Sequence, residues 1–402
     1  MNSSKFLCLF LLCFWSCQGQ KHQTSFSNSE PPKKETPKIV GGGCDGCELM
    51  YVGMPKYINA IDTSMGWHAS NAQKLLIRGK VFQLDGTTPA PNVVLYYWHT
   101  DVNGYYSNWN GTTKRHGNLR GWIKTDEQGN YTIYTNRPTA YPDKSEPQHI
   151  HISIKEPDIQ QEYYIDDLVF DDDPILYKKN KAGKKPENRG GSGVLRVLIS
   201  KDVQIAEHNI ILGLHIPNYP KKVEQKVSSG LSIGEDSPSF IPFHAWGADK
   251  ATRTCPVCKY DRYQGILLFV GESPDWLDIK KWLTFLEKES EKRAKELKVY
   301  FVYGNSKNYH AQNRRKELEN LGLELSLRHI ALTFVPSLQD AESEVNLNKI
   351  NPDVKNTFII YHHRKIIQKF INFEATQKNF QSLSDFLDKN KSPYNHLLGV
   401  NY

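Results

Sequence analysis

The stretch QHIHISI at residues 148–154 decides how this chain of 402 residues is interpreted. Successive side chains of a β-strand point to opposite faces, so His149 and His151 face the same way, about 7 Å apart along the strand. One metal ion can bind both imidazoles. An isolated pair of this kind is more often hydrogen-bonded at a protein surface, so the neighbouring sequence has to decide between the two interpretations.

Two tyrosines, Tyr106 and Tyr141, accompany this pair between residues 102 and 154. A phenolate is a hard, anionic oxygen donor, and two phenolates beside two imidazoles favour Fe(III) over softer or less charged ions. Zinc more readily binds thiolates. Tyrosine is also a common strand residue, and the chain has 21 of them. The pattern therefore predicts a ferric site, with ordinary strand tyrosines as the alternative.

Strand signals follow one another closely between residues 75 and 214, for example LLIRGKVFQL, NVVLYYWHT and GNYTIYTN. Turn sequences such as LDGTTPAPN and DEQGN separate them, and helical periodicity is absent. This pattern predicts an all-β antiparallel sandwich. In such a fold we expect the iron ligands on strands and connecting loops at one edge.

Three segments in chain order, WHTDVNGYY, RGWIKTDEQGNYTIYTNRPTAYP and PQHIHISI, resemble the intradiol ring-cleavage dioxygenases of the catechol and protocatechuate types. The resemblance extends from Leu75 to Tyr219. It implies an Fe(III) cofactor, and it implies the following ligands: Tyr106, Tyr141, His149 and His151. Tyr105 is the rival of Tyr106, because adjacent strand residues face opposite ways and only one can reach the metal.

The resemblance also implies an activity, the cleavage of a catechol-like aromatic with O2 between its two hydroxyl-bearing carbons. In that chemistry Tyr141 gives up its place on the ion to the substrate and takes up a substrate proton. Arg120 and Trp122 could line the substrate pocket together with Trp98 and Trp109, although core packing is the commoner duty of a single tryptophan.

Two acidic residues depart from the family pattern. Glu146 stands where the catabolic enzymes have an arginine, three residues before the first histidine, and Asp167 stands where they have a glutamine. If these carboxylates face the pocket, they repel an anionic substrate. Neutral catechols or larger diol-bearing aromatics are then the expected substrates. The same two residues motivate an alternative function, a non-catalytic metal-bearing sandwich that binds a diol, a sugar or a protein.

Residues 1–17 predict a lipoprotein-type signal peptide, because Lys5 precedes a short apolar run that ends at Trp15. Cys17 follows a small residue and is the expected lipidation site, with cleavage by signal peptidase I as the alternative. Residues 18–40 are polar and predict a flexible tether. We therefore expect the protein in the bacterial cell envelope, in the periplasm or at the cell surface. The segments GGGCDGCE and YYIDDLVFDDDP also resemble an exported bacterial branch of the family.

Four cysteines remain after the signal peptide, in two C-x-x-C pairs: Cys44 with Cys47, and Cys255 with Cys258. The long gap between the pairs is unlike the spacing of a zinc ribbon. Two separate disulfides or redox pairs are the expectation in an oxidising compartment. For the first pair we expect a local loop lock.

The sandwich is predicted at residues 41–219 and a polar linker at residues 220–239, and the hydrophobic pattern of the sequence changes after them. Residues 240–402 alternate between strand and helix patterns and resemble the thioredoxin-like fold. Cys255 and Cys258 precede the strand GILLFVG, so we expect them to lack a helix N-terminus that would lower a thiol pKa. A structural disulfide or a docking role is expected, and a thiol-disulfide protein is the third interpretation of the chain.

The net charge of +7 is modest, and no basic stripe interleaved with aromatic residues predicts a nucleic-acid partner. The basic run at residues 177–193 is interpreted as a solvated loop. The expected partners are a catechol-like small molecule, O2 and the membrane, through the lipid anchor. No protein partner of the C-terminal domain is identified by the sequence.

Overall fold

The computed structural model describes residues 38–399 except residue 45 and residues 108–114, 184, 222–226 and 294–295. Residues 39–402 form one compact unit. The predicted signal peptide, Cys17 and nearly all of the predicted tether lie outside the described residues, as does Trp109. No helix in the described part of the chain is long and apolar enough to cross a membrane.

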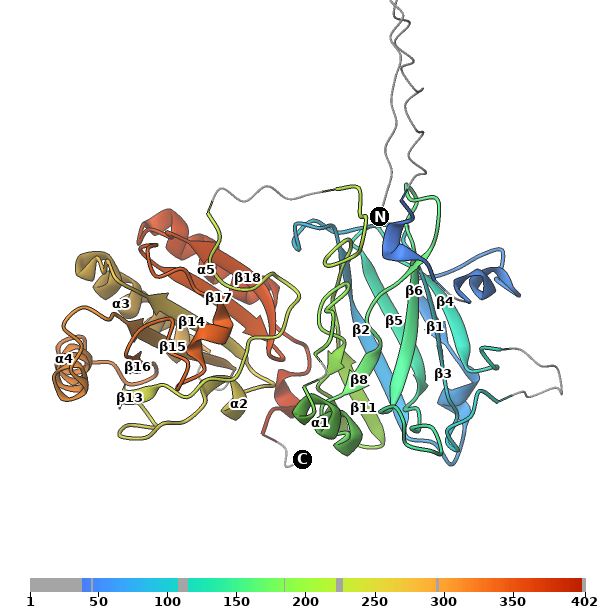
Figure 1. Cartoon of the computed structure of the whole chain (residues 1–402), viewed down its shortest axis with the longest axis horizontal. Coiled ribbons are helices and arrows are strands. Elements are labelled where there is room, and N and C mark those ends of the chain that lie inside the picture. The colour runs from blue at the N-terminus through green and yellow to red at the C-terminus, as the bar shows by residue number, and fades with distance from the viewer. Residues whose placement is uncertain are drawn as a thin grey trace, which may run out of the picture. The chain divides into compact units, whose positions relative to one another are not determined.

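Two six-stranded sheets form the sandwich (Figure 1). The first sheet has the order β1-β5-β2-β11-β10, and β12 also pairs with β2. Its strands are β1 (Ile61–Thr63), β2 (Lys74–Phe82), β5 (Asn130–Asn136), β10 (Leu198–Ser200), β11 (Val203–Glu207) and β12 (Ile210–Ile211). The second sheet has the order β4-β3-β6-β8-β9, and β7 also pairs with β6. Its strands are β3 (Val94–His99), β4 (Arg120–Lys124), β6 (His149–Lys155), β7 (Tyr163–Tyr164), β8 (Leu168–Phe170) and β9 (Val194–Leu195).

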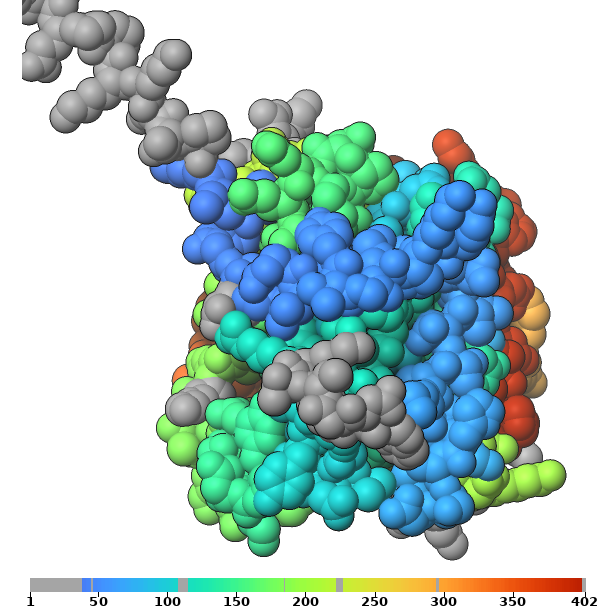
Figure 2. Space-filling model, turned by 90° about the vertical axis from the view of Figure 1, so that its right-hand side faces the viewer, coloured from blue at the N-terminus to red at the C-terminus, as the bar shows by residue number. Residues whose placement is uncertain are grey.

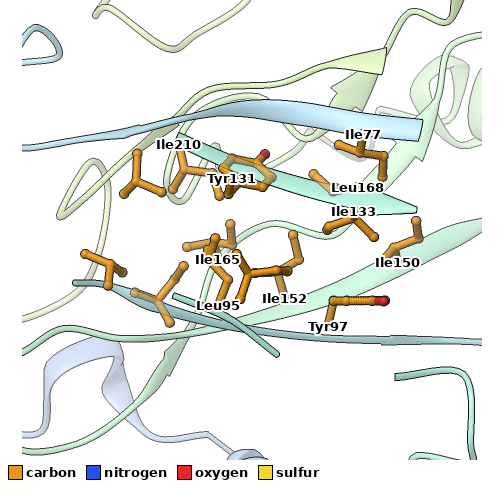
Figure 3. Packing of buried hydrophobic residues seen from close by; sticks show 14 of the residues in the cluster. Ile77, Leu95, Tyr97, Tyr131, Ile133, Ile150, Ile152, Ile165, Leu168 and Ile210 are labelled. Carbon is orange, nitrogen blue, oxygen red and sulfur yellow. The ribbon is translucent and has the colours of Figure 1, made fainter. Parts of the chain in front are cut away.

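The core of the sandwich lies between the two sheets. Ile77 and Ile133 of the first sheet and Leu95 and Ile152 of the second are buried in one apolar cluster, and Figure 3 shows side chains from both sheets turned toward one another. Side chains that alternate along each strand produce this inner layer. The outer face of each sheet is thereby left for other contacts.

The sandwich that the sequence predicts is present, but the expectation of a purely antiparallel arrangement is wrong. Strand β1 runs parallel to β5, β11 and β12 run parallel to β2, and β9 runs parallel to β8. These partners are far apart in sequence, so no hairpin dictates their relative direction.

The start of the basic run, between β8 and β9, differs from its prediction as a loop, whereas its described residues from 182 to 193 have no regular structure. Residues Pro174–Lys181 form helix α1. The Asp173 carboxylate caps it by accepting a hydrogen bond from the Ile175 amide at 2.7 Å, and Pro174 fits the first turn. This start signal outweighs the polar composition of the run.

The C-terminal part of the unit is a third six-stranded sheet with helices. The sheet order is β13-β16-β15-β14-β17-β18, in which β14, β15 and β16 are parallel to one another. The strands are β13 (Phe243–Trp246), β14 (Gln264–Val270), β15 (Leu297–Gly304), β16 (Ala331–Val335), β17 (Thr357–His362) and β18 (Lys365–Ile371). The α-helices are α2 (Pro256–Lys259), α3 (Trp276–Lys292), α4 (Ala311–Glu324) and α5 (Gln377–Lys389). The predicted α/β alternation is seen, and its assignment to the thioredoxin-like fold stays a prediction.

Short 3-10 helices occur in both parts of the unit: η1 (Val40–Gly42), η2 (Cys47–Tyr51), η3 (Met65–His68), η4 (Val345–Asn348) and η5 (Asn395–Leu397). In Figure 2 the residues that follow the N-terminal end of the described chain, drawn in blue, cross one face of the sandwich. In this stretch η2 places Met50 against Tyr96 and Trp98 of β3. The outer face of the second sheet is thus partly covered by its own N-terminal segment.

Cys255 is placed differently from its prediction. It is the N-cap of the single-turn helix α2, and its Sγ accepts a hydrogen bond from the Cys258 amide at 3.1 Å. Pro256 presets the first turn of this helix, which is too short to show a periodic pattern in the sequence. The expectation that Cys255 lacks a helix N-terminus is therefore wrong. Cys255 and Cys258 form a disulfide.

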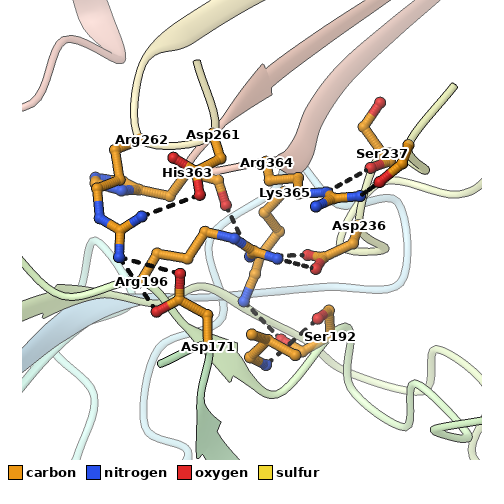
Figure 4. A network of polar contacts seen from close by, with 12 residues as sticks. Asp171, Ser192, Arg196, Asp236, Ser237, Asp261, Arg262, His363, Arg364 and Lys365 are labelled. Carbon is orange, nitrogen blue, oxygen red and sulfur yellow. Dashed lines mark hydrogen bonds and ion pairs between the residues drawn. The ribbon is translucent and has the colours of Figure 1, made fainter. Parts of the chain in front are cut away.

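Part of the predicted polar linker is packed into the unit. Asp236 pairs with Arg196, whose Nη2 lies 2.6 Å from the carboxylate, and Arg196 Nη1 donates to the His363 carbonyl at 3.0 Å. Lys365 Nζ donates to the Ser192 carbonyl at 2.6 Å. Figure 4 shows this network of charged side chains from the sandwich, the linker and the C-terminal sheet. Charged groups this deeply buried need such partners.

Candidate metal centre

Strand β6 carries both histidines on the outer face of the second sheet. Ile150, Ile152 and Ile154 are buried in the sandwich core, and the alternating residues His149 and His151 point away from it. The candidate ligands lie on a strand and on connecting loops, as expected, but β6 lies between β3 and β8 and not at an edge of its sheet.

Four side-chain atoms converge beside this outer face. Tyr106 Oη lies 2.6 Å from Tyr141 Oη and 2.9 Å from His151 Nε2. His149 Nε2 lies 3.2 Å from Tyr141 Oη and 3.1 Å from His151 Nε2. Atoms that bind one ion at about 2 Å stand about 3 Å apart, so these contacts have the spacing of ligands that share an ion.

The second ring nitrogen of each histidine is also engaged. His149 Nδ1 donates to the Pro147 carbonyl at 2.6 Å. His151 Nδ1 lies 2.8 Å from Asp167 Oδ1. Both contacts direct Nε2 toward the tyrosine oxygens, and a carboxylate partner of this kind raises the basicity of a metal-binding imidazole. The two rings are therefore oriented before any ion binds.

Tyr106 is positioned by a tight loop after β3. Asp101 accepts hydrogen bonds from the Asn103 and Tyr105 amides at 2.8 and 3.1 Å. Gly104 has a φ of 82°, and a Cβ there would lie 2.3 Å from the Ala140 carbonyl oxygen, so only glycine fits. The close approach brings the loop that carries Tyr106 against the loop that carries Tyr141.

Tyr105, the rival ligand, points away from the site. Its side chain is 60% exposed, whereas Tyr106 is half-buried and contacts two of the other candidate ligands. His99, another histidine of the domain, is buried and bonded to the Thr100 carbonyl and the Thr135 hydroxyl, both at 2.8 Å. It therefore belongs to the interior of the fold and not to the convergent group.

Arg120 and Trp122, predicted to line the substrate pocket, contact the N-terminal segment. Trp122 Nε1 donates to the Met50 carbonyl at 2.7 Å, and Arg120 Nη2 donates to the Val52 carbonyl at 3.0 Å. Their apolar surroundings include Tyr106. They support the layer behind the site, and they are not among the described residues that line the cavity beside His151.

The disulfide between Cys44 and Cys47 closes a short loop within this N-terminal segment, as predicted. Cys47 Sγ lies 3.2 Å from the hydroxyl of Ser153, the next outward-facing residue of β6 after His151. The ring of Trp98 stacks on the His151 imidazole at 4.9 Å between centroids. One side of the centre is thus closed by an aromatic layer, and the first C-x-x-C pair lies beside that layer.

A cavity of about 1110 Å³ opens on the other side. His151, Asp167 and Glu146 are among its lining residues. Glu146 forms an ion pair with Lys179. Both acidic residues therefore border the cavity, as the sequence suggested. Lys179 offsets the charge of Glu146, and the Asp167 carboxylate is engaged by the His151 ring. The expected repulsion of anionic substrates is weaker than unpaired carboxylates would produce.

Burial shifts the pKa values within the centre. It raises the pKa of Tyr106, and the Tyr141 hydroxyl raises it further. Burial also raises the pKa of Tyr141. Burial lowers the pKa of His149, as does the nearby His151 imidazole. A cation is what converts such phenols into phenolates, whereas the neutral imidazole is already in its ligand form.

The donor set fits a ferric ion. Two phenolates and the Asp167 carboxylate together supply three negative charges around two neutral imidazoles, which suits a trivalent ion better than a divalent one. Within the described residues, a second group of histidines and carboxylates close enough to hold an ion consists of Glu207, His362 and His363, and it contains no phenol.

The sequence placed Asp167 behind the ligands or in the substrate pocket, but it did not predict the contact of Asp167 with His151. Strand β8 pairs with β6 so that His149 faces Val169 and Ile150 faces Leu168. One position further along this register, His151 faces Asp167. Only the strand pairing reveals this relation, because 15 residues separate the two in sequence.

This part of the chain is similar in sequence to known proteins. A family model described as "Dioxygenase" matches residues 58–187. A catechol 1,2-dioxygenase of Acinetobacter baylyi is 32% identical over 94 residues, which cover 22% of this chain and 30% of that protein. An intradiol ring-cleavage dioxygenase of Aspergillus niger is 28% identical over 130 residues, which cover 27% of this chain and 41% of that protein.

Among solved structures, the dioxygenase domain of a dioxygenase and carbohydrate-binding protein fusion from Streptomyces sp. SirexAA-E matches with a TM-score of 0.31. It is 20% identical, and the match covers 44% of this chain and 98% of that one.

The sequence matches confirm the predicted family: residues 58–187 carry a domain of the intradiol ring-cleavage dioxygenases. All four convergent residues lie within this range. The match spans only 30% of the Acinetobacter protein and 41% of the Aspergillus protein. These partial matches assign the domain, whereas the activity and the substrate of the whole protein are proposals.

Iron-loaded protein is expected to absorb visible light through tyrosinate-to-iron charge transfer and to be red-brown to purple. Tyr106→Phe and Tyr141→Phe should each weaken the band, and the double substitution should abolish it, because the phenol oxygens are the donors. Tyr105→Phe is the matched control and should leave the band unchanged. Absorbance and iron content are measured together. Survival of the band in the double variant would show that other residues bind the iron.

Asp167→Asn is expected to weaken iron retention about 10- to 100-fold, the usual effect of losing a partner of a metal-binding histidine. The amide can still accept from His151 but adds no negative charge. Competition with a chelator gives the affinity, and Asp158→Asn, at an exposed position of the same domain, is the control. Equal affinities of Asp167→Asn and the parent protein would assign Asp167 a packing role only.

Proposed function

We propose that this chain is an exported, non-haem Fe(III) intradiol dioxygenase that cleaves a catechol-like aromatic with O2. The observation that carries the proposal is the convergence of two phenol oxygens and two imidazole nitrogens within 2.6–3.2 Å contacts on one sheet face. The matched relatives, a catechol 1,2-dioxygenase and an intradiol ring-cleavage dioxygenase, support the same class of reaction.

The protein's own contribution is a rigid set of donors. Pro147 and Asp167 hold the two imidazoles in place, so their Nε2 atoms need no reorganisation when an ion and a substrate bind. The bound ion would supply the electron-withdrawing centre that makes a chelated diol reactive toward O2. Strand β6 itself is fixed by pairing on both edges, with β3 and with β8.

Tyr141 is the residue proposed to take up a substrate proton. It lies on the loop between β5 and β6 rather than on a strand. Its hydroxyl contacts the Tyr106 hydroxyl and the Nε2 atom of His149. A loop residue can withdraw from the ion with less cost to the sheet than a strand residue could. Tyr106, which contacts both Tyr141 and His151, is the phenol proposed to stay in place.

The cavity supports a substrate larger than a simple catechol. Its volume of about 1110 Å³ exceeds the roughly 300–1,000 Å³ of most ligand pockets, and His151 is the one proposed ligand among its described lining residues. Its wall carries both signs of charge, since Glu146 and Asp167 line it together with Lys179. A neutral diol-bearing aromatic with a polar extension fits such a wall better than a small dianion does.

The proposed location is the cell envelope, with Cys17 as the lipid anchor. Two disulfides in the described residues support an oxidising compartment. Cys17→Ser should move the protein from the membrane fraction to the soluble fraction, which cell fractionation measures. Cys8→Ser, within the same predicted signal, is the control. An unchanged distribution would favour cleavage by signal peptidase I.

Iron-loaded protein is expected to consume O2 with a diol substrate and to form a product with muconate-type absorbance. The panel contains catechol, protocatechuate and larger neutral catechols, and we expect the larger neutral compounds to give the highest kcat/KM. Tyr141→Phe should lose turnover, whereas Tyr105→Phe should retain it. If no diol supports oxygen uptake while the coloured centre is intact, the chain is instead a non-catalytic binding module.

A further inference from the structure

A second group of potential metal ligands lies away from the tyrosine and histidine centre. Glu207 is the last residue of β11, in the first sheet of the sandwich. His362 ends β17 of the third sheet, and His363 follows it in the turn to β18. One potential ligand atom of each residue lies within 4.8 Å of the others. We call Glu207, His362 and His363 the junction cluster.

The junction cluster contains buried polar atoms without partners. His363 is only 4% exposed, and neither of its ring nitrogens has a hydrogen-bond partner among the described residues. The same holds for Nε2 of His362 and Oε2 of Glu207. Buried polar atoms are nearly always hydrogen-bonded. Glu207 Oε2 and His363 Nε2 face each other as an ion pair, so His362 Nε2 and His363 Nδ1 are the two buried atoms that no described group engages. These two nitrogens are open to a component absent from the polypeptide.

The spacing inside the junction cluster suits a metal ion. His363 Nε2 lies 3.4 Å from Glu207 Oε2, without the geometry of a hydrogen bond. Zinc binds imidazole nitrogen and carboxylate oxygen at about 2.0–2.2 Å with tetrahedral angles, which places two such ligands about 3.4 Å apart. The observed ion-pair distance is also compatible with two ligands of one ion.

The backbone bends so that two adjacent histidines face the same carboxylate. Neighbouring residues of a regular strand point to opposite faces, yet the rings of His362 and His363 are 4.2 Å apart between centroids. His363 and Arg364 form the two-residue turn between β17 and β18, with positive φ angles of 48° and 66°. Asparagine and glycine are the usual residues in such a turn, so histidine here has a conformational cost.

The polar network described above holds this turn in place. Arg196 Nη1 donates to the His363 carbonyl at 3.0 Å, and Arg364 Nε donates to the Ser237 carbonyl at 2.9 Å. Figure 4 shows Arg196 and Arg364 on either side of Asp236. These contacts engage the backbone of His363 and leave its imidazole for the junction cluster.

The surroundings provide room for a further ligand. Glu207, His362 and His363 line a cavity of about 350 Å³ whose wall also carries basic residues: Arg78, Lys80, Lys389 and Lys391. A doubly charged ion with one carboxylate ligand keeps a net positive charge, and an anion drawn to the basic wall would complete its coordination. Three protein ligands with one open position are a common arrangement of zinc.

We propose that Glu207, His362 and His363 bind a divalent transition-metal ion of the zinc type. This ion would join strand β11 of the sandwich to the hairpin of β17 and β18. Two imidazoles and one carboxylate, without thiolates or phenols, suit a divalent ion such as Zn²⁺ or Fe²⁺ and not the ferric ion proposed for the other centre. The inference is independent of the proposed dioxygenase function, because it shares no ligand with that site.

Zinc binding by the full chain tests the proposal, with both disulfides kept oxidised so that no thiolate competes. His149→Ala combined with His151→Ala removes two donors of the other centre and serves as the parent protein. This metal-free parent is expected to bind one Zn²⁺ per chain in competition with a chelator. X-ray absorption should show two imidazoles and oxygen ligands around the zinc. No zinc uptake, or a zinc shell without imidazoles, would overturn the proposal.

Two substitutions in this parent identify the ligands. His363→Asn keeps a residue that tolerates the left-handed turn, and Glu207→Gln keeps the shape of the side chain. Each should weaken zinc binding by about 100-fold or more, exceeding the 10- to 100-fold loss typical of an indirect partner. His329→Ala, at an exposed position outside the cluster, should bind zinc like the parent. Undiminished binding in both cluster variants would overturn the proposal, and far-UV circular dichroism without zinc verifies that each variant is folded.

Discussion

The alternation of side chains along β6 is the constraint on which the rest of the molecule depends. Its isoleucines fill the space between two sheets, and its histidines face outward to the candidate iron centre. A shift of its pairing by one residue would bury both imidazoles and expose the apolar side chains. The stability of the sandwich therefore enforces the geometry of the site, because the same register serves both.

The parts that sequence could predict are those with local causes. Period-two patterning predicted the strands, and the family resemblance supplied the four candidate ligands. Asp101 and Gly104 act within a few residues of Tyr106, so the motif that contains them already encodes the loop. Even the choice between Tyr105 and Tyr106 could be posed from the sequence, although only the fold shows which side chain is exposed.

The parts that sequence did not predict arise from long-range pairing. Asp167 reaches His151 only because β8 lies beside β6, and no spacing rule relates the two. The parallel pairs of the first sheet join strands that are far apart in the chain. Residues 227–239 look like a linker because they are polar, yet Asp236 is matched to Arg196 across the unit. Composition alone does not separate a solvated charge from a paired one.

The contacts of Arg196 and Lys365 have a consequence for how this chain can be divided. A polypeptide that ended at Tyr219 would retain the Arg196 side chain, which is 6% exposed in the whole unit, but would lose Asp236. The complementary fragment would retain Lys365 and lose the carbonyl of Ser192, to which it donates. An uncompensated buried charge raises the free energy of the folded state, so each fragment would be destabilised by its unpaired side chain. The sandwich and the C-terminal sheet are therefore expected to be less stable when they are separated than within the whole unit.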